Sequence, residues 1–102
     1  MNTEKDISKD FLIRIGENIK RKRKKKDLSM EELGLEIGLT RMQVNRIEKG
    51  YNITMITLLK LSIALEVKME QLLQSNYKYK KEDLERLVNT NKASRKKVAK
   101  KK

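Results

Sequence analysis

The apolar residues between positions 28 and 51 recur with the spacing of two short helices. In the first, Met30, Leu33 and Ile37 are three and four residues apart, so they share one face of an α-helix. Gly38 follows at once, and glycine readily adopts the left-handed backbone conformation that ends a helix. The pattern therefore predicts a short helix that stops at a fixed point and is followed by a tight turn.

A second short helix is predicted to begin after Thr40, with Val44 and Ile47 on its buried face. Ser29 and Thr40 stand immediately before the two helices, where a hydroxyl can accept a hydrogen bond from a free backbone N–H group. Glu32, three residues after Ser29, can complete a reciprocal capping box. Each helix thus has its own start signal.

The outward face of this second helix carries side chains that can bond to bases and phosphates. Arginine can donate two hydrogen bonds to guanine, whereas glutamine and asparagine suit adenine. Methionine offers only apolar contact, for which a thymine methyl group is a partner. The residues of this face are Arg41, Met42, Gln43, Asn45 and Arg46.

Helical spacing covers most of the remaining chain, and no stretch keeps the polar–apolar alternation of a strand. Helices are predicted from about residue 10 to 26, from 55 to 65 and from 68 to 73, and another can form over 81 to 88. The fold class is therefore all-α, a compact five-helix domain with an extra C-terminal helix and a basic tail. The stripes predicted to be buried are Phe11, Ile15 and Ile19, then Met55, Leu58, Leu61, Ser62 and Leu65, then Met69, Leu72 and Leu73.

Composition divides the chain into three parts. Residues 1–9 are polar and expected to be flexible. Residues 10–75 hold the five helices, and residues 76–102 form a basic extension. Beyond residue 89 the extension lacks the apolar side chains that offset the entropy lost on ordering, so it is expected to be partly disordered. Its lysines serve either to follow DNA phosphates or only to maintain solubility.

The charge of the chain favours an anionic partner. Lysine and arginine outnumber aspartate and glutamate by 26 to 14, which gives a net charge of +12. A solvated lysine-rich surface would account for this composition equally well. Together with the two-helix pattern, however, the charge favours nucleic acid, because cations displace the counterions condensed on a phosphate backbone.

Several function classes are excluded or disfavoured by composition. The chain has no cysteine and no histidine, so disulfides and thiolate metal sites are excluded and the commonest general base and metal ligand is missing. We therefore expect no enzyme, no cofactor and no metal. No apolar run approaches the ~18 residues of a membrane span, and residues 1–10 lack the apolar segment of a signal peptide. A cytoplasmic protein is expected.

The stretch from about residue 15 to 73 resembles the Cro/cI-type helix-turn-helix family of bacterial and phage regulators, also called the xenobiotic-response-element family. The likeness needs no insertion and covers over half of the chain. It is carried by Ile15, Ile19, Arg23, Leu28, Ser29, Glu32, Leu33, Gly38, Leu39, Thr40, Val44, Arg46, Ile47, Glu48, Gly50, Asn52, Ile53, Thr54, Thr57, Leu58, Leu59, Lys60 and Leu61.

The resemblance implies that the second short helix enters the major groove of double-stranded DNA. Its main base-reading residues would be Arg41, Met42 and Arg46, flanked by Gln43 and Asn45. The family often has glutamine where this chain has Met30, which cannot bond a phosphate. The basic run of residues 20–26 is expected to supply compensating charge. The expected phosphate contacts are Ser29, Thr40, Lys49, Asn52, Lys24 and Lys26.

The resemblance also implies an ion pair between Arg23 and Glu48. A planar guanidinium can make two parallel hydrogen bonds to a carboxylate and thereby fix the first helix against the third. We expect this pair to be structural and not to contact DNA.

An apolar row along the fourth helix departs from the family, which commonly has polar residues at Ile56 and Ile63. Leu59 lies between these two residues, and Val67 and Leu73 extend the row. Two interpretations remain open. The row is either a dimer interface, because exposed apolar patches are uncommon on monomers, or the floor of a core covered by the C-terminal segment.

The function expected from these features is sequence-specific transcriptional regulation by a homodimer bound to a palindromic operator, with half-sites about one helical turn (~34 Å) apart. An antitoxin that binds a toxin partner and regulates its own operon is an alternative, as is an RNA-associated basic protein. No separate sensor domain follows residue 75, so no small-molecule ligand is expected.

Overall fold

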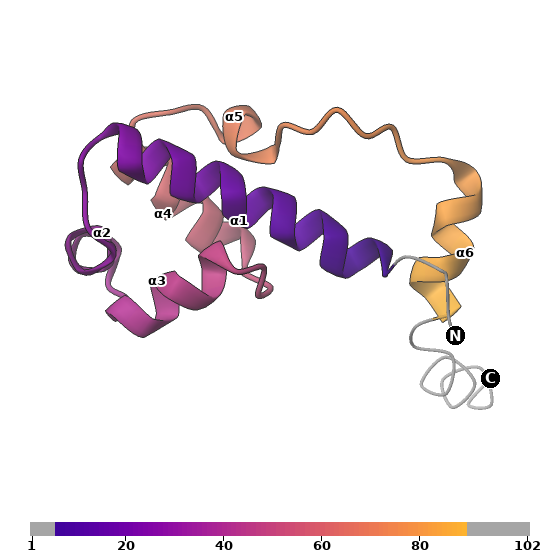
Figure 1. Ribbon diagram of the computed structural model, residues 1–102, viewed down its shortest axis with the longest axis horizontal. Helices are drawn as coiled ribbons and strands as arrows, with labels where there is room; N and C mark the ends of the chain where they lie inside the picture. The colour runs from indigo at the N-terminus through magenta and orange to yellow at the C-terminus, as the bar shows by residue number, and fades with distance from the viewer. Residues whose placement is uncertain (1–5, 90–102) are drawn as a thin grey trace.

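The computed structural model describes residues 6–89, and within them every regular element is a helix (Figure 1). Residues 1–5 and 90–102 lie outside the described part. They include part of the N-terminus that was expected to be flexible and the basic tail beyond residue 89. The all-α prediction is confirmed, and so is the additional C-terminal helix. The helices are α1 (Ile7–Lys25), α2 (Met30–Ile37), α3 (Arg41–Glu48), α4 (Met55–Leu65), α5 (Met69–Leu73) and α6 (Lys81–Asn89).

The first helix begins earlier than predicted. Its N-cap is Asp6, whose carboxylate accepts a hydrogen bond from the backbone N–H of Lys9 (3.1 Å), and Ile7 is buried. This hydrogen bond, with another from Ser8, lowers the pKa of the Asp6 carboxyl. The predicted start near Asp10 is therefore wrong, because a cap and a buried isoleucine precede it.

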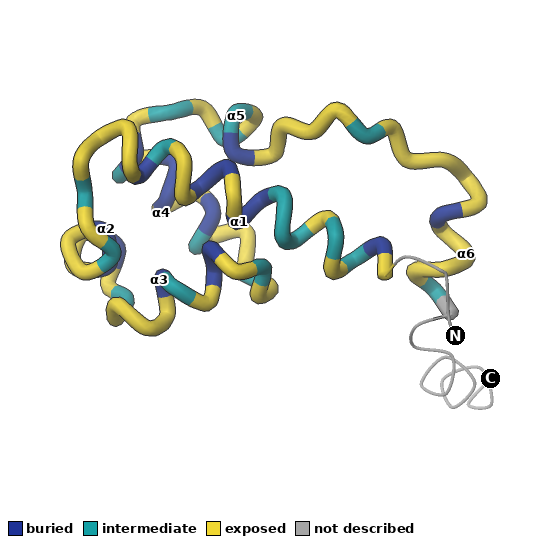
Figure 2. The backbone as a smooth tube through the Cα atoms, in the orientation of Figure 1, coloured by how far each residue is buried: buried dark blue, intermediate teal, exposed yellow. Residues whose placement is uncertain are grey.

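The core lies where α1 to α5 meet, and Figure 2 shows buried positions recurring along α1. Its fully covered side chains come from all five helices: Ile19, Leu33, Val44, Leu61, Leu65 and Leu72. These positions are predicted by helical periodicity, as is the burial of Ser62. Phe11 and Met55, also predicted to be buried, are 37% and 68% exposed. Met55 is the first residue of α4, where fewer neighbouring helices can cover the side chain, whereas Phe11 packs against the ring of Tyr79. Leu73, predicted to be buried at the end of α5, is 39% exposed.

Close backbone packing joins α1 to α3 at a glycine. A Cβ atom added to Gly16 would lie 2.6 Å from the carbonyl oxygens of Ile47 and Glu48. Only glycine leaves the space for this approach. The packing fixes the C-terminal end of α3 against the long first helix.

The sixth helix lies apart from the five-helix core (Figure 1). An extended segment over residues 74–80 leads from α5 to α6, and α6 contacts the N-terminal half of α1. None of the helices over residues 6–89 is long and apolar enough to cross a membrane.

Candidate nucleic-acid interface

Both short helices begin with a capping box; the one at Ser29 was predicted, whereas at Thr40 only the N-cap was predicted. At α2 the Ser29 hydroxyl accepts from the N–H of Glu32 (3.0 Å), and the Glu32 carboxylate accepts from the N–H of Ser29 (2.8 Å). At α3 the same exchange joins Thr40 and Gln43, with distances of 3.1 and 2.8 Å. Gly38 ends α2 with φ of +77°. The turn between the helices is therefore fixed by the left-handed Gly38 at the end of α2 and by the capping box at the start of α3.

Helix α3 presents one buried and one exposed face. Val44 is 0% exposed and Ile47 is 7% exposed, so both are anchored in the core. Three predicted base-reading side chains, Arg41, Met42 and Arg46, are exposed. Burial of the two aliphatic residues thus turns two arginines and a methionine outward together.

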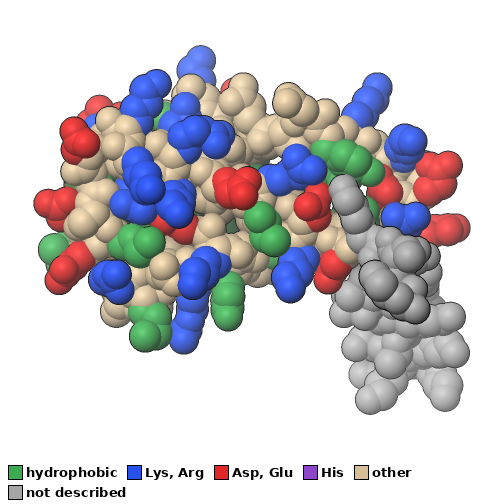
Figure 3. Space-filling model, viewed as in Figure 1, with side chains coloured by type: hydrophobic (Ala, Val, Ile, Leu, Met, Phe, Trp, Pro, Cys, Tyr) green, Lys and Arg blue, Asp and Glu red, His purple; other side chains and the backbone are tan. Residues whose placement is uncertain are grey.

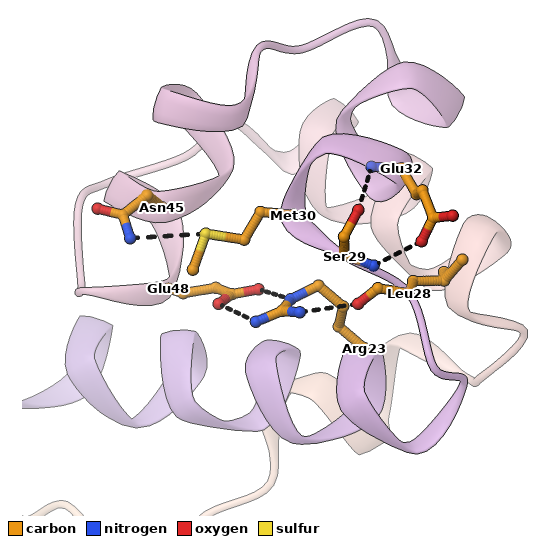
Figure 4. A network of polar contacts seen from close by, with 7 residues as sticks. All are labelled: Arg23, Leu28, Ser29, Met30, Glu32, Asn45 and Glu48. Atoms are coloured by element: carbon orange, nitrogen blue, oxygen red, sulfur yellow. Dashed lines mark hydrogen bonds and ion pairs between the residues drawn. The ribbon is translucent and has the colours of Figure 1, made fainter.

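The two predicted amide residues of α3 have partners within the protein. The side-chain oxygen of Gln43 belongs to the capping box, which leaves its NH₂ group as the free half of the amide. Asn45 is half-buried and its NH₂ group donates to the sulfur of Met30 at 3.6 Å (Figure 4). To pair with adenine through both of its groups, each amide would have to share a group that already has a partner within the protein.

The predicted phosphate contacts differ in availability. Ser29 and Thr40 are exposed and use a hydroxyl lone pair in their caps, so each O–H can still donate. Lys24 and Lys49 are exposed. The two remaining residues already have partners within the protein. The Asn52 side-chain oxygen accepts from the N–H of Ile53 (2.9 Å), and the ammonium of Lys26 lies 3.1 Å from the carboxylate of Glu66.

The ion pair expected between α1 and α3 is present. The Nε of Arg23 donates to one oxygen of Glu48 (2.6 Å) and its Nη2 donates to the other (3.1 Å), as Figure 4 shows. The remaining Nη1 donates to the carbonyl of Leu28 at 2.8 Å, at the entrance to α2. Both side chains are buried, with 8% and 2% exposed. One guanidinium therefore ties together α1, α3 and the start of α2.

The surface carries its charges unevenly. Figure 3 shows lysine and arginine side chains gathered over the C-terminal half of α1, whereas acidic side chains gather at the edge formed by α2 and around α6. The exposed cations of the run over residues 20–26 thus form a cationic surface on α1, whereas Arg23 is buried in its ion pair.

The apolar row of α4 is uncovered within the described residues. Ile56, Leu59 and Ile63 are 61%, 42% and 68% exposed, Val67 is half-buried, and Leu73 is 39% exposed. Helix α6 contacts α1 instead of this row. The interpretation in which the C-terminal segment covers the row is therefore wrong for the part of that segment that ends at residue 89.

The sequence pattern of the helix-turn-helix family matches residues 19–72, which include α2, α3 and the ion pair. The chain belongs to the Cro/cI-type branch of this family. Its members are DNA-binding transcription regulators.

Solved structures agree with this assignment. The chain is 33% identical to the restriction-modification controller protein C.AhdI from Aeromonas hydrophila, with a TM-score of 0.60 over 62% of this chain and 93% of that one. It is 31% identical to the hypothetical transcription factor NHTF from Neisseria, with a TM-score of 0.62 over 74% of this chain and 88% of that one. No protein of curated function matches the sequence.

The burial of two polar residues, Asn18 and Asp83, is not predicted from the sequence. Asn18 lies on the buried face of α1, where its NH₂ group donates to the carbonyls of Leu72 (2.9 Å) and Gln74 (2.8 Å). Asp83 is 6% exposed and caps the start of α6 through the N–H of Lys80 (2.8 Å). In the sequence, each appears only as a polar residue at a position of its helix where an apolar residue is expected. That pattern does not show which group the side chain bonds to.

Proposed function

We propose that this member of the family is a sequence-specific transcriptional regulator that acts as a homodimer on a palindromic operator. The observation that carries the proposal is the burial of Val44 and Ile47, since it turns Arg41 and Arg46 outward from a capped, rigid helix. The similarity to a controller protein and to a hypothetical transcription factor supports a regulatory role.

Arg41 and Arg46 are the principal base-reading residues in this proposal. A guanidinium can donate two hydrogen bonds to O6 and N7 of guanine, and no ion pair of either arginine occurs among residues 6–89. Met42 supplies apolar contact to a thymine methyl group. Gln43 keeps its capping bond and uses only its NH₂ group, as a donor to a base acceptor. Asn45 bonds to Met30 of α2 and contributes less to base reading than the two arginines.

Phosphate contacts position α3 without selecting a sequence. The hydroxyls of Ser29 and Thr40 and the ammonium groups of Lys24 and Lys49 are the contacts that the observed bonding favours. Lys26 contributes once its ion pair with exposed Glu66 opens, which costs little because surface ion pairs are worth about 0–1 kcal/mol. Asn52 contributes through its NH₂ group.

The exposed row of α4 is the proposed dimer interface. Ile56, Leu59 and Ile63 supply apolar area, and a shallow hollow of about 520 Å³ beside Ile63 is lined by oppositely charged side chains, including Lys60 and Glu66. In a two-fold interface the same patch faces itself, so each lysine can meet an acidic side chain of the second copy. Dimerisation would double the number of bases read.

Selection of bound sequences from a random DNA duplex pool tests the function. We expect a palindromic site whose half-sites are centred about 34 Å apart or a multiple of it. Sedimentation of the free protein should give the mass of two chains. Recovery of duplexes without a shared sequence would contradict the proposal.

A further inference from the structure

A polar hollow lies between α1 and the start of the extended segment that leads from α5 to α6. Its volume is about 420 Å³, and residues 74–76 form one of its walls. The family's sequence pattern ends at residue 72, so this wall belongs to chain beyond the matched region. The other wall is one face of α1, from which Arg14, Glu17, Asn18 and Arg21 line the hollow.

A buried amide orients the first of the two arginines. Asn18 is 6% exposed, and its NH₂ group donates to the carbonyls of Leu72 (2.9 Å) and Gln74 (2.8 Å). Its oxygen accepts from the guanidinium of Arg21. Arg21 has no ion pair among residues 6–89. The guanidinium is therefore held by a side chain that is itself fixed, and most of its N–H groups are left for a ligand.

The second arginine is held from two sides. The Nε of Arg14 donates to the carboxylate of Asp10 (3.2 Å), and the guanidinium lies 5.8 Å from the centre of the Tyr77 ring, which is the geometry of a cation–π contact. These contacts leave its two terminal nitrogens as donors. Arg14 and Arg21 are two helical turns apart, about 10 Å along the axis of α1, so the hollow has one guanidinium toward each end.

The opposite wall adds neutral donors. The Ser75 hydroxyl accepts from the N–H of Tyr77 (3.1 Å), so its O–H can still donate. Gln74 and Asn76 are exposed and each carries an NH₂ group. The lining also contains one carboxylate, that of Glu17, which has no ion pair within the described part of the chain. Cations thus outnumber carboxylates in the lining by two to one.

The hollow lies on the side of α1 away from α3. Gly16 faces α3, because a Cβ atom added to it would lie 2.6 Å from the carbonyl oxygens of Ile47 and Glu48. Successive residues of an α-helix are about 100° apart, so Arg14 and Asn18 are roughly 200° from Gly16 around the helix. DNA bound to the exposed face of α3 would lie beyond α3, and its phosphates would not occupy the hollow.

We propose that this hollow binds a small molecule through an oxyanion of the phosphate or carboxylate class. The oxyanion lies between the guanidinium groups of Arg14 and Arg21, which donate charge-assisted hydrogen bonds to it. Glu17 limits the negative charge that the site accepts. Because the ligand contacts both α1 and residues 74–76, it joins the family domain to the segment that carries α6. The sequence predicts no small-molecule ligand, since the hollow forms only where two segments distant in the chain meet.

Titration of the full-length chain with inorganic phosphate, and separately with acetate, tests the site by NMR. The Nε–H signals of Arg14 and Arg21 and the side-chain NH₂ signals of Asn76 should shift and reach saturation. Sodium chloride at the same ionic strength should not reproduce these shifts. The oxyanion with the lower Kd identifies the class of ligand. Shifts confined to Gln43 on α3, with no saturable change in the hollow for either oxyanion, would overturn the proposal.

Two charge-neutralising variants should change the affinity in opposite directions. Arg21→Gln should raise the Kd for the preferred oxyanion by about threefold or more, and Glu17→Gln should lower it by a similar factor, as expected for partly exposed charges. Lys9→Gln is the matched control, because it removes an exposed cation from another face of α1 and should leave the Kd unchanged. A merely structural role of Arg21 would not produce tighter binding in Glu17→Gln. Equal Kd values in all these proteins would contradict the assignment.

Thermal unfolding of each variant shows whether the core is retained. Glu17 is exposed, so its variant should fold even if the loss of Arg21 disturbs Asn18. The hollow includes no residue of α3, so this inference goes beyond the proposed DNA binding and does not depend on it. Failure to select a DNA sequence would leave the oxyanion site standing, and failure to bind either oxyanion would overturn the site alone.

Discussion

The side chains of Arg23 and Glu48 join the end of α1 to the end of α3 through two parallel hydrogen bonds of 2.6 and 3.1 Å. Only 8% and 2% of these side chains are exposed. The pair lies directly behind the helix proposed to read DNA, so it sets the position of that helix against the rest of the fold. It also leaves Arg23 unavailable for phosphate contact.

Glu48→Ala should lower the free energy of unfolding by about 3–5 kcal/mol, because it leaves a buried guanidinium without its counter-charge. Glu66→Ala is the matched control. It removes the carboxylate, 75% exposed, that pairs with Lys26. The free energy of unfolding should fall by at most about 1 kcal/mol. Urea unfolding measures both. Equal midpoints for the two variants would mean that the Arg23–Glu48 pair does not hold the helices together.

Arg46→Ala should weaken binding to the selected operator by about 1–3 kcal/mol and relax the preference at one base position. The guanidinium is exposed on α3 and has no ion pair in the described part of the chain. Lys68→Ala is the control, since this exposed lysine precedes α5. Titration of labelled operator and of its single-base variants gives both quantities. Unchanged operator affinity in Arg46→Ala would show that α3 does not dock in the proposed register.

Gln43 caps α3 and is proposed to contact a base, and substitution can separate these two roles. Gln43→Ala removes the acceptor of the Thr40 N–H and should destabilise the fold by about 0.5–1.5 kcal/mol. Gln43→Glu keeps an acceptor at the same place but removes the NH₂ donor proposed to meet a base. It should therefore unfold like the native chain yet bind the operator more weakly. Chemical unfolding and DNA titration of the same two proteins provide the comparison, and native-like DNA binding by Gln43→Glu would remove the base contact.

The features that the sequence predicts correctly depend on interactions between residues close together in the chain. The caps at Ser29 and Thr40 join residues three positions apart, and Val44 and Ile47 are separated by one helical turn. Such signals are contained within a few residues of sequence. The fold and the outward face of α3 follow from them.

The interactions that were missed join residues distant in the sequence. The contacts of Asn18 with Leu72 and Gln74 span more than 50 positions, and Phe11 meets Tyr79 across nearly the whole described chain. Periodicity gives the angle of a side chain on its helix but not where the neighbouring helix ends. The placement of α6, and the exposure of Met55, therefore required the structure.

Asp27→Gly should stabilise the protein by up to about 1 kcal/mol, because relief of about 1–2 kcal/mol of left-handed strain exceeds the roughly 0.5–1 kcal/mol of extra entropy that glycine gives the unfolded chain. Asp27 follows α1 with φ of +58°, a left-handed conformation that glycine adopts without steric cost. The surrounding bonds, from the N–H of Asp27 to Lys24 and from the N–H of Leu28 to Arg23, form a Schellman motif that accepts glycine at this position. Thermal unfolding measures the change. A lower midpoint would mean that the Asp27 side chain makes a stabilising contribution larger than the backbone strain it causes.

The double substitution Ile56→Lys, Ile63→Lys should convert the proposed dimer into a monomer. Each lysine would place an unpaired charge in an apolar interface at a cost of about 2 kcal/mol or more, so association should weaken by more than tenfold. Stability of the single chain should change little, because both isoleucines are more than 60% exposed in it. Leu35→Lys is the matched control, since Leu35 is 78% exposed on α2, outside the α4 row. Sedimentation equilibrium of the three proteins decides the question, and a native chain that remained monomeric at high concentration would remove the interface altogether.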